Sequence, residues 1–265
     1  MKLNKLAAVL AASSMLASGV AMAEPFYMDV SQFTASYAQD GKTANIFQLA
    51  VDWNATSTYI DDNGLAGLNL GDSVIDSGFG TVTGFLGSNG GGIFGSNNNE
   101  GIGSNYQIRF AYDDLQGKIA AMSTTSSAIL AAYSSGTINV YGSAIDGDGN
   151  IVGIESQLLK LNVFGSGGDL ANAIIFATVS DPLPGTWFFP PAVDWSSLTV
   201  AINMRLDTNL DTRTPPADIG DGRFTRTTTL NGSVEFNRVP EPSALALLGI
   251  GLFGLGAARR LKKAA

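Results

Sequence analysis

Several stretches of the chain alternate apolar and polar residues with a period of two, and this pattern limits the fold more than any other feature. The alternation is found in these stretches: 47–53, 106–112, 137–141, 159–163, 198–206, 224–230 and 233–236. A period of two places every second side chain on one face of an extended strand. Clusters of Asp, Asn and Gly, which favour turns, lie at 61–64 and 146–150. The pattern predicts a mainly β chain with antiparallel strands.

Strands with one apolar face must bury that face against one another. We expect an antiparallel two-sheet β-sandwich over residues 24–238, because two packed sheets hide both apolar faces. Helix-like patterns are scarce. Residues 122–133 are the best candidate for a helix in this body, since Ser and Thr precede Ala and Leu there and Gly136 follows. Residues 170–177 fit a short helix or a strand.

The chain of 265 residues has no Cys and no His. This composition excludes disulfides, thiolate and imidazole metal ligands, cysteine nucleophiles and the Ser-His-Asp triad. An enzyme would have to depend on carboxylates, and no pair stands out among Glu24, Glu100, Glu155 and Glu235. We therefore expect a protein that is not an enzyme and has no cofactor, with a carboxylate-dependent, glycan-active enzyme as the least favoured alternative.

Charge is distributed unevenly along the chain. Residues 24–240 hold nine Lys and Arg against 22 Asp and Glu, whereas the remaining basic residues lie at the two ends. An acidic body repels the phosphates of nucleic acids and attracts divalent cations. We expect no nucleic-acid partner, and calcium is the one metal that this composition favours.

Two groups of oxygen side chains have the one-three-five spacing with which a calcium-binding loop begins. They are Asp146, Asp148 and Asn150, and Asp207, Asn209 and Asp211. Neither continues as an EF-hand, because position six is Ile151 in the first and Thr212 in the second rather than Gly. The alternative for each group is a solvated hairpin turn, in which Asp and Asn are favoured for backbone reasons.

A proline-rich segment, 181–195, contains closely spaced aromatic residues. Trp187 and Trp195 are candidates for a platform on which a sugar ring stacks. The alternative is that these rings belong to the hydrophobic core.

The first 23 residues have the three parts of a secretory signal peptide. Lys2 and Lys5 supply the positive start, 6–20 is the apolar middle, and Ala21 and Ala23 frame an A-x-A cleavage site. We expect signal peptidase to remove residues 1–23 and the mature chain to begin at Glu24, outside the cytoplasm.

The last 27 residues, 239–265, form a second targeting signal, at the other end of the chain from the signal peptide. The tetrapeptide Val239, Pro240, Glu241, Pro242 is stiff and extended. The uncharged stretch 244–258 predicts a short transmembrane helix, although it is shorter than the roughly 20 residues that a stable span needs. A cluster of basic residues follows this stretch and should stay on the cytoplasmic side of the membrane, where it stops further translocation of the chain: Arg259, Arg260, Lys262 and Lys263.

Together these residues resemble the PEP-CTERM sorting signal: the Val-Pro-Glu-Pro motif, a Gly- and Leu-rich membrane segment and a basic tail, in that order. The resemblance implies export through the inner membrane, recognition by a membrane exosortase and removal of the tail. It also implies a Gram-negative host that makes extracellular polysaccharide, and a protein at the cell surface or in the extracellular matrix.

The layout of signal peptide, Gly-rich β body and sorting tail is also similar to flocculation-associated proteins with this tail. This similarity implies a non-enzymatic role in exopolysaccharide-associated aggregation, flocculation or biofilm formation. A secreted, lectin-like carbohydrate-binding module is the alternative. The expected partners are signal peptidase, an exosortase, the inner membrane during sorting, and extracellular polysaccharide.

Overall fold

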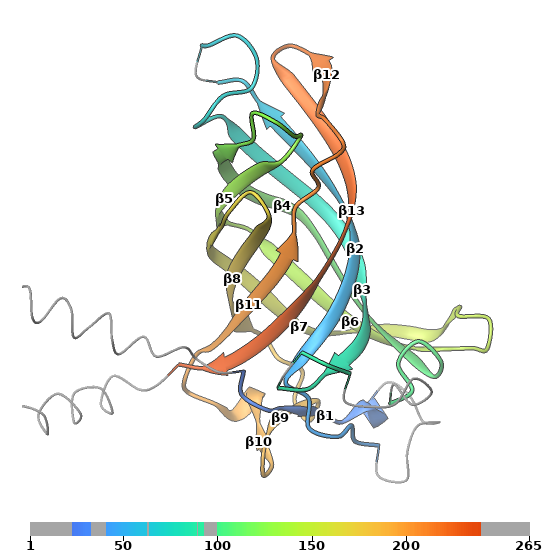
Figure 1. Cartoon of the computed structure of the whole chain (residues 1–265). Coiled ribbons are helices and arrows are strands. Elements are labelled where there is room, and N and C mark those ends of the chain that lie inside the picture. Colours follow the sequence, from blue (N-terminus) through green and yellow to red (C-terminus); the bar gives the residue numbers. More distant parts are fainter. Residues whose placement is uncertain (1–22, 33–40, 63, 89, 93–99, 240–265) are drawn as a thin grey trace, which may run out of the picture.

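The computed structural model describes residues 23–32, 41–62, 64–88, 90–92 and 100–239, and these residues form an almost entirely β structure (Figure 1). The elements, in chain order, are β1 (Tyr27–Met28), η1 (Val30–Gln32), β2 (Gln48–Ile60), β3 (Ser73–Leu86), β4 (Tyr106–Met122), β5 (Ile129–Ser135), β6 (Thr137–Ile145), β7 (Ile151–Gly168), β8 (Asn172–Ser180), β9 (Trp187–Phe189), β10 (Val193–Asp194), η2 (Trp195–Ser197), β11 (Ile202–Asn209), β12 (Ala217–Gly220) and β13 (Arg223–Arg238). The mainly β, antiparallel class predicted from the alternation is confirmed.

The principal sheet closes on itself, and we refer to it below as the closed sheet. Its strands follow one another as β2, β3, β4, β6, β7, β8, β11 and β13, every pair is antiparallel, and β13 pairs with β2 again. The predicted two-sheet sandwich is therefore wrong. The long strands β2, β3, β4, β7 and β13 bend around a common interior (Figure 1), so one sheet buries its own apolar face without a second layer.

The alternation in β2 shows how the sequence fills this interior. Residues with odd numbers from Leu49 to Tyr59 are buried, whereas the residues between them are exposed or half-buried. The same period-two pattern holds in β11 from Ile202 to Thr208. One face of each strand lines the interior, and the other face is outside.

The segment predicted to be a helix, 122–133, is a turn followed by β5. β5 pairs with the second half of β4, and β6 pairs with its first half, so β5 and β6 together occupy one strand position. Gly136 joins them with a φ of +135°, and a Cβ there would lie 2.5 Å from Leu115 Cδ2. Residues 170–177 contribute to strand β8, not to a helix.

A small second sheet, with β9 between β1 and β10, lies at one end of the closed sheet (Figure 1). Its aromatic rings pack against the last strand of the closed sheet. Phe26 lies 5.4 Å from Phe236 between ring centroids, and Trp195 lies 5.1 Å from Phe236. These rings close this end with a hydrophobic plug.

Candidate functional site

Both ends of the described body meet at the end of the closed sheet that the plug covers. The backbone N–H of Glu24 donates to the carbonyl of Phe236 at 3.3 Å and to Oδ1 of Asn237 at 3.0 Å. The Glu24 carboxylate and the Arg238 guanidinium form an ion pair, with Arg238 Nε 2.9 and 3.1 Å from the two carboxylate oxygens. The first residue after the predicted signal peptide is therefore fixed beside the last residue of β13.

The sorting motif starts directly at this junction. The N–H of Val239 donates to the carbonyl of Ala201 at 2.8 Å, so the body still holds the backbone of the first motif residue. Of the other residues predicted for the two targeting signals, Ala23 is described and directly precedes Glu24. The rest lie outside the described residues: Ala21, Pro240, Glu241, Pro242, Arg259, Arg260, Lys262 and Lys263. Within the described ranges, no helix has the length and apolar character to cross a membrane.

The first predicted calcium triplet is the hairpin turn between β6 and β7. Asp146 Oδ1 accepts hydrogen bonds from the backbone N–H groups of Asp148 at 3.0 Å and Asn150 at 2.9 Å. Hydrogen bonds from the backbone and side chain of Asn150 lower the pKa of Asp146 below its ordinary value. These oxygens are thus used to hold the turn, which is the alternative that the sequence left open.

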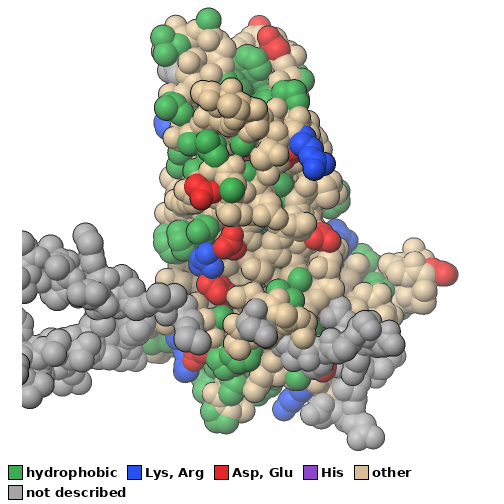
Figure 2. Space-filling model, in the orientation of Figure 1, with side chains coloured by type: hydrophobic (Ala, Val, Ile, Leu, Met, Phe, Trp, Pro, Cys, Tyr) green, Lys and Arg blue, Asp and Glu red, His purple; other side chains and the backbone are tan. Residues whose placement is uncertain are grey.

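The second triplet is not brought together. Asp207 Oδ2 pairs with Arg205 Nη2 at 2.7 Å, and the side-chain amide of Asn209 donates to Oδ1 of Asn231 at 3.0 Å. Asp211 Oδ1 instead accepts from the N–H of Arg213 at 2.7 Å, beyond the end of β11. Acidic side chains are spread over the face seen in Figure 2, and no group of three or more His, Cys, Asp or Glu residues that could hold a metal ion occurs in the described part of the chain.

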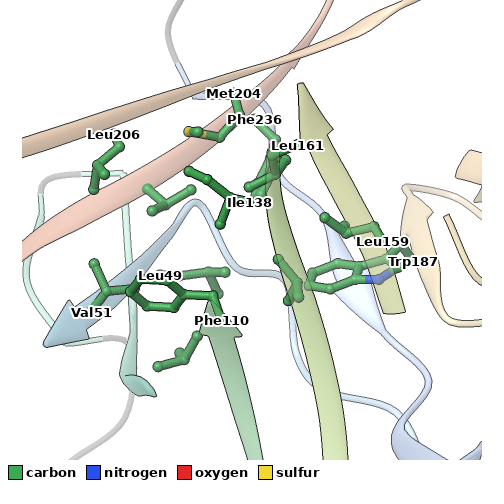
Figure 3. A pocket seen from close by; sticks show the side chains of 13 residues that line it. Leu49, Val51, Phe110, Ile138, Leu159, Leu161, Trp187, Met204, Leu206 and Phe236 are labelled. Carbon is green, nitrogen blue, oxygen red and sulfur yellow. The ribbon is translucent and has the colours of Figure 1, made fainter. Parts of the chain in front are cut away.

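The two tryptophans predicted as a sugar platform are core residues. Trp187 is 1% exposed and Trp195 is 2% exposed, and their rings stack on each other at 5.2 Å between centroids. Trp187 also points into an apolar cavity inside the closed sheet, together with Leu49, Leu159 and Phe236 (Figure 3). Neither ring leaves a face for a sugar, so the stacking prediction is wrong for this fold.

A second, polar cavity lies farther along the interior, away from the plug. Asp76 of β3 and Arg226 of β13 line it, and their side chains are buried. Four of its other lining residues carry a hydroxyl group: Ser57, Tyr59, Tyr112 and Tyr133. Apolar residues also line it, among them Trp53, Leu115, Ile129 and Ile175. The absence of a side chain at Gly78 leaves room for the Tyr112 ring, because a Cβ at Gly78 would lie 2.5 Å from the Tyr112 hydroxyl oxygen.

Asp76 is the ionisable centre of this cavity. Its Oδ2 accepts a hydrogen bond from the Tyr133 hydroxyl, whereas its Oδ1 is buried without a hydrogen-bond partner. Burial raises the pKa of Asp76 to about 6, although hydrogen bonds from Tyr133 and Ser57 and the charge of Arg226 act in the opposite direction. At neutral pH the carboxyl is therefore ionised inside the sheet.

Arg226 connects the cavity to two loops, one that follows β4 and one that follows β11. Its Nη1 donates to the carbonyl of Ser127 at 2.9 Å and to that of Asp211 at 3.5 Å, and the guanidinium lies 5.6 Å from the centroid of the Tyr59 ring. The loops also bond directly, from Ser127 N–H to the carbonyl of Thr212 at 3.1 Å. The Nε of Arg226 is buried without a hydrogen-bond partner.

Neither charged residue of this cavity was among the site residues predicted from the sequence. The parity of β13 was the available signal, because Arg226 has the same parity as the buried residues Val234 and Phe236. In β3, Asp76 likewise has the parity of buried Val74. A charged residue at an inward position predicts a buried polar site.

Three of the four glutamates considered for catalysis form ion pairs with arginines. Glu155 pairs with Arg109 at 3.3 Å, and Glu235 pairs with Arg205 at 3.2 Å. Glu24 is held by Arg238, as described above. The fourth, Glu100, lies outside the strands.

Comparison with known proteins identifies one feature of the chain. Residues 238–260 match the PEP-CTERM protein-sorting motif. No curated protein and no solved structure matches the chain. The motif marks an exported protein that an exosortase sorts, and proteins that carry it are anchored at the cell surface. The resemblance drawn from the C-terminal residues is thus confirmed.

Proposed function

We propose that this protein is a non-enzymatic component of the cell surface or extracellular matrix, which acts in exopolysaccharide-associated aggregation, flocculation or biofilm formation. The observation that carries the proposal is the position of the sorting motif. It begins at the residue where β13 ends, so the closed sheet is the cargo that the exosortase delivers.

The geometry of the ends supports this role. Glu24 and Arg238 hold the predicted mature N-terminus against the start of the motif, so a single rim of the body carries both processing sites. Removal of both signals leaves a closed sheet with an apolar interior, and some large apolar side chains, among them Phe79, Ile154 and Phe164, remain exposed on its outside. Such a body suits a structural protein in an aqueous matrix.

The non-enzymatic part of the proposal is supported by the carboxylates. A glycan-active enzyme of the usual kind needs two carboxyl groups on opposite sides of the scissile bond. Glu155 and Glu235 are each engaged by an arginine. Asp76 is enclosed in the closed sheet, where a polysaccharide chain does not reach it.

The lectin-like alternative gains no support from the residues on which it depended. Trp187 and Trp195 stack on each other inside the plug. Contact with polysaccharide would have to involve the outer face and the loops of the closed sheet.

Deletion of the gene in the producing bacterium tests the proposal. We expect the deletion strain to lose aggregation, measured as the fraction of cells that settle, and the full-length chain to restore it. A chain that ends at Val239 keeps the described body but lacks the rest of the motif, so it should be exported without restoring aggregation.

Two outcomes would overturn the proposal. One is a deletion strain that aggregates like the parent. The other is release of new reducing ends when the purified protein is incubated with the extracellular polysaccharide of its host, because that result would reveal an enzyme.

A further inference from the structure

Two opposite charges share the polar cavity without touching each other. Asp76 Oδ1 and Arg226 Nε are both buried, neither has a hydrogen-bond partner, and both residues line the same cavity. The ion pairs among the described residues do not include these two side chains. Ionised groups removed from water destabilise the fold unless other groups satisfy them. A molecule inside the cavity must therefore supply the hydrogen-bond partners of Asp76 Oδ1 and Arg226 Nε.

The hydrogen-bonding chemistry of Asp76 Oδ1 and Arg226 Nε limits which ligand the polar cavity can bind. Arg226 Nε is a donor and needs an acceptor, whereas Asp76 Oδ1 is an acceptor and needs a donor. A cation would satisfy Asp76 but would be repelled by Arg226, and an anion would have the opposite difficulty. A hydroxyl group both donates and accepts, so a neutral hydroxylated molecule satisfies both atoms.

The lining residues and the volume of the cavity further limit which neutral hydroxylated molecules it can bind. Trp53, Leu115 and Ile175 provide apolar surface for carbon-bound hydrogens, while Thr208 and Thr228 add hydroxyl residues to the wall. The volume of the cavity is about 50 Å³, which is more than a single water molecule requires. So small a volume favours a polyol with a short carbon chain.

We propose that the polar cavity of the closed sheet is a binding site for a small neutral polyol of the glycerol class. One hydroxyl donates to Asp76 Oδ1, another accepts from Arg226 Nε, and the carbon chain lies against Trp53. Entry requires the loops around Ser127 and Thr212 to separate, because they are hydrogen-bonded to each other and to Arg226, which lines the cavity. The proposal is independent of the role in aggregation.

Equilibrium dialysis of the exported protein with radiolabelled glycerol tests the proposal and tolerates slow entry. We expect saturable binding of one glycerol per chain, with a dissociation constant on the order of 1 mM for so small a ligand. Propan-1-ol has the same carbon chain with one hydroxyl, so it should compete at least tenfold more weakly.

Two variants locate the site. Ala131→Leu places a larger side chain on the cavity wall, and we expect it to weaken glycerol binding at least tenfold. Val51→Ile enlarges a residue of the apolar cavity instead and should leave binding unchanged. If Ala131→Leu does not fold, Ala173→Val, which enlarges another wall of the same cavity, serves in its place, and we expect the same loss of glycerol binding.

The proposal fails if the wild-type protein binds no glycerol in a saturable manner, because water alone then fills the cavity. It also fails if propan-1-ol competes as well as unlabelled glycerol. Equal binding by the wild-type protein and the cavity variant would place glycerol elsewhere on the molecule and would likewise overturn it.

Discussion

At the scale of single residues, identity alone did not reveal which side chains are buried. Trp187 and Trp195 lie in a proline-rich segment that would suit an exposed platform, yet both rings belong to the plug. Asp76 and Arg226 are charged and still lie inside the closed sheet. In each case the position on the strand or in the small sheet decides the environment.

Replacement of Trp187 by Ala tests the assignment of this ring to the plug. We expect the free energy of unfolding to fall by about 3–5 kcal/mol, the usual cost of removing a buried large aromatic side chain. Denaturant titration with tryptophan fluorescence measures the change. A variant that is as stable as the wild-type protein but has lost binding to a polysaccharide would favour the exposed platform instead.

Asp76 should make the stability depend on pH. Its pKa is raised from 3.8 to about 6 in the folded chain, so the folded state binds the proton more tightly than the unfolded state. The free energy of unfolding should therefore fall as the pH rises from 3 to 7, by about 3 kcal/mol from this group. Asp76→Asn cannot ionise, so its stability relative to the wild-type protein should rise by that amount between pH 3 and pH 7. Parallel stability curves for the two proteins would contradict the prediction.

At the scale of elements, period-two alternation predicted β2, β4, β6, β7, β11 and β13 but missed the Gly-containing strand β3, and composition wrongly predicted a helix at β5. Residues 122–133 contain good helix formers, but the edge of β4 is free beyond its pairing with β6, and β5 pairs there. Tyr133 also turns its hydroxyl to Asp76 from this strand. Tertiary pairing thus overrides the local preference for a helix.

The junction of β5 and β6 depends on Gly136. We expect Gly136→Ala to lower the free energy of unfolding by about 1–3 kcal/mol, because any Cβ there meets Leu115 and the φ of +135° is unfavourable for other residues. Gly147→Ala is the matched control, since a Cβ at this turn position meets nothing within 4 Å. Thermal unfolding of both variants measures the difference, and equal stability of the two would refute this role of Gly136.

At the scale of the whole molecule, the closed sheet brings the two ends of the body together. Glu24 and Arg238 are 214 positions apart in sequence and form an ion pair beside the sorting motif. The ring of strands produces this meeting, because β13 returns to pair with β2. The body therefore presents both processing sites at one rim.

A double-mutant cycle on this pair measures the coupling of the two ends. We expect Glu24→Gln and Arg238→Gln each to reduce stability slightly, with a coupling of about 0.5–1 kcal/mol, because the ion pair is partly exposed. Urea unfolding of the four proteins gives the value. Strictly additive effects would show that the pair does not hold the ends together.

Intact-mass measurement of the exported protein tests the two targeting signals together. We expect a chain that begins at Glu24 and has lost its basic C-terminal residues. A full-length mass in the extracellular fraction would contradict processing at both ends.

The sequence by itself predicted the strands β2, β4, β6, β7, β11 and β13 in part, the acidic body and the sorting signal, because alternation, composition and a contiguous motif are local properties of the chain. It did not determine whether the strands form two layers or one ring, since the same inward and outward faces satisfy both arrangements. Only the tertiary structure closed the sheet, buried Trp187 and Trp195, and placed Asp76 and Arg226 in one cavity. Strand bending and pairing across the chain brought these residues together, and neither is a property of any local stretch of sequence.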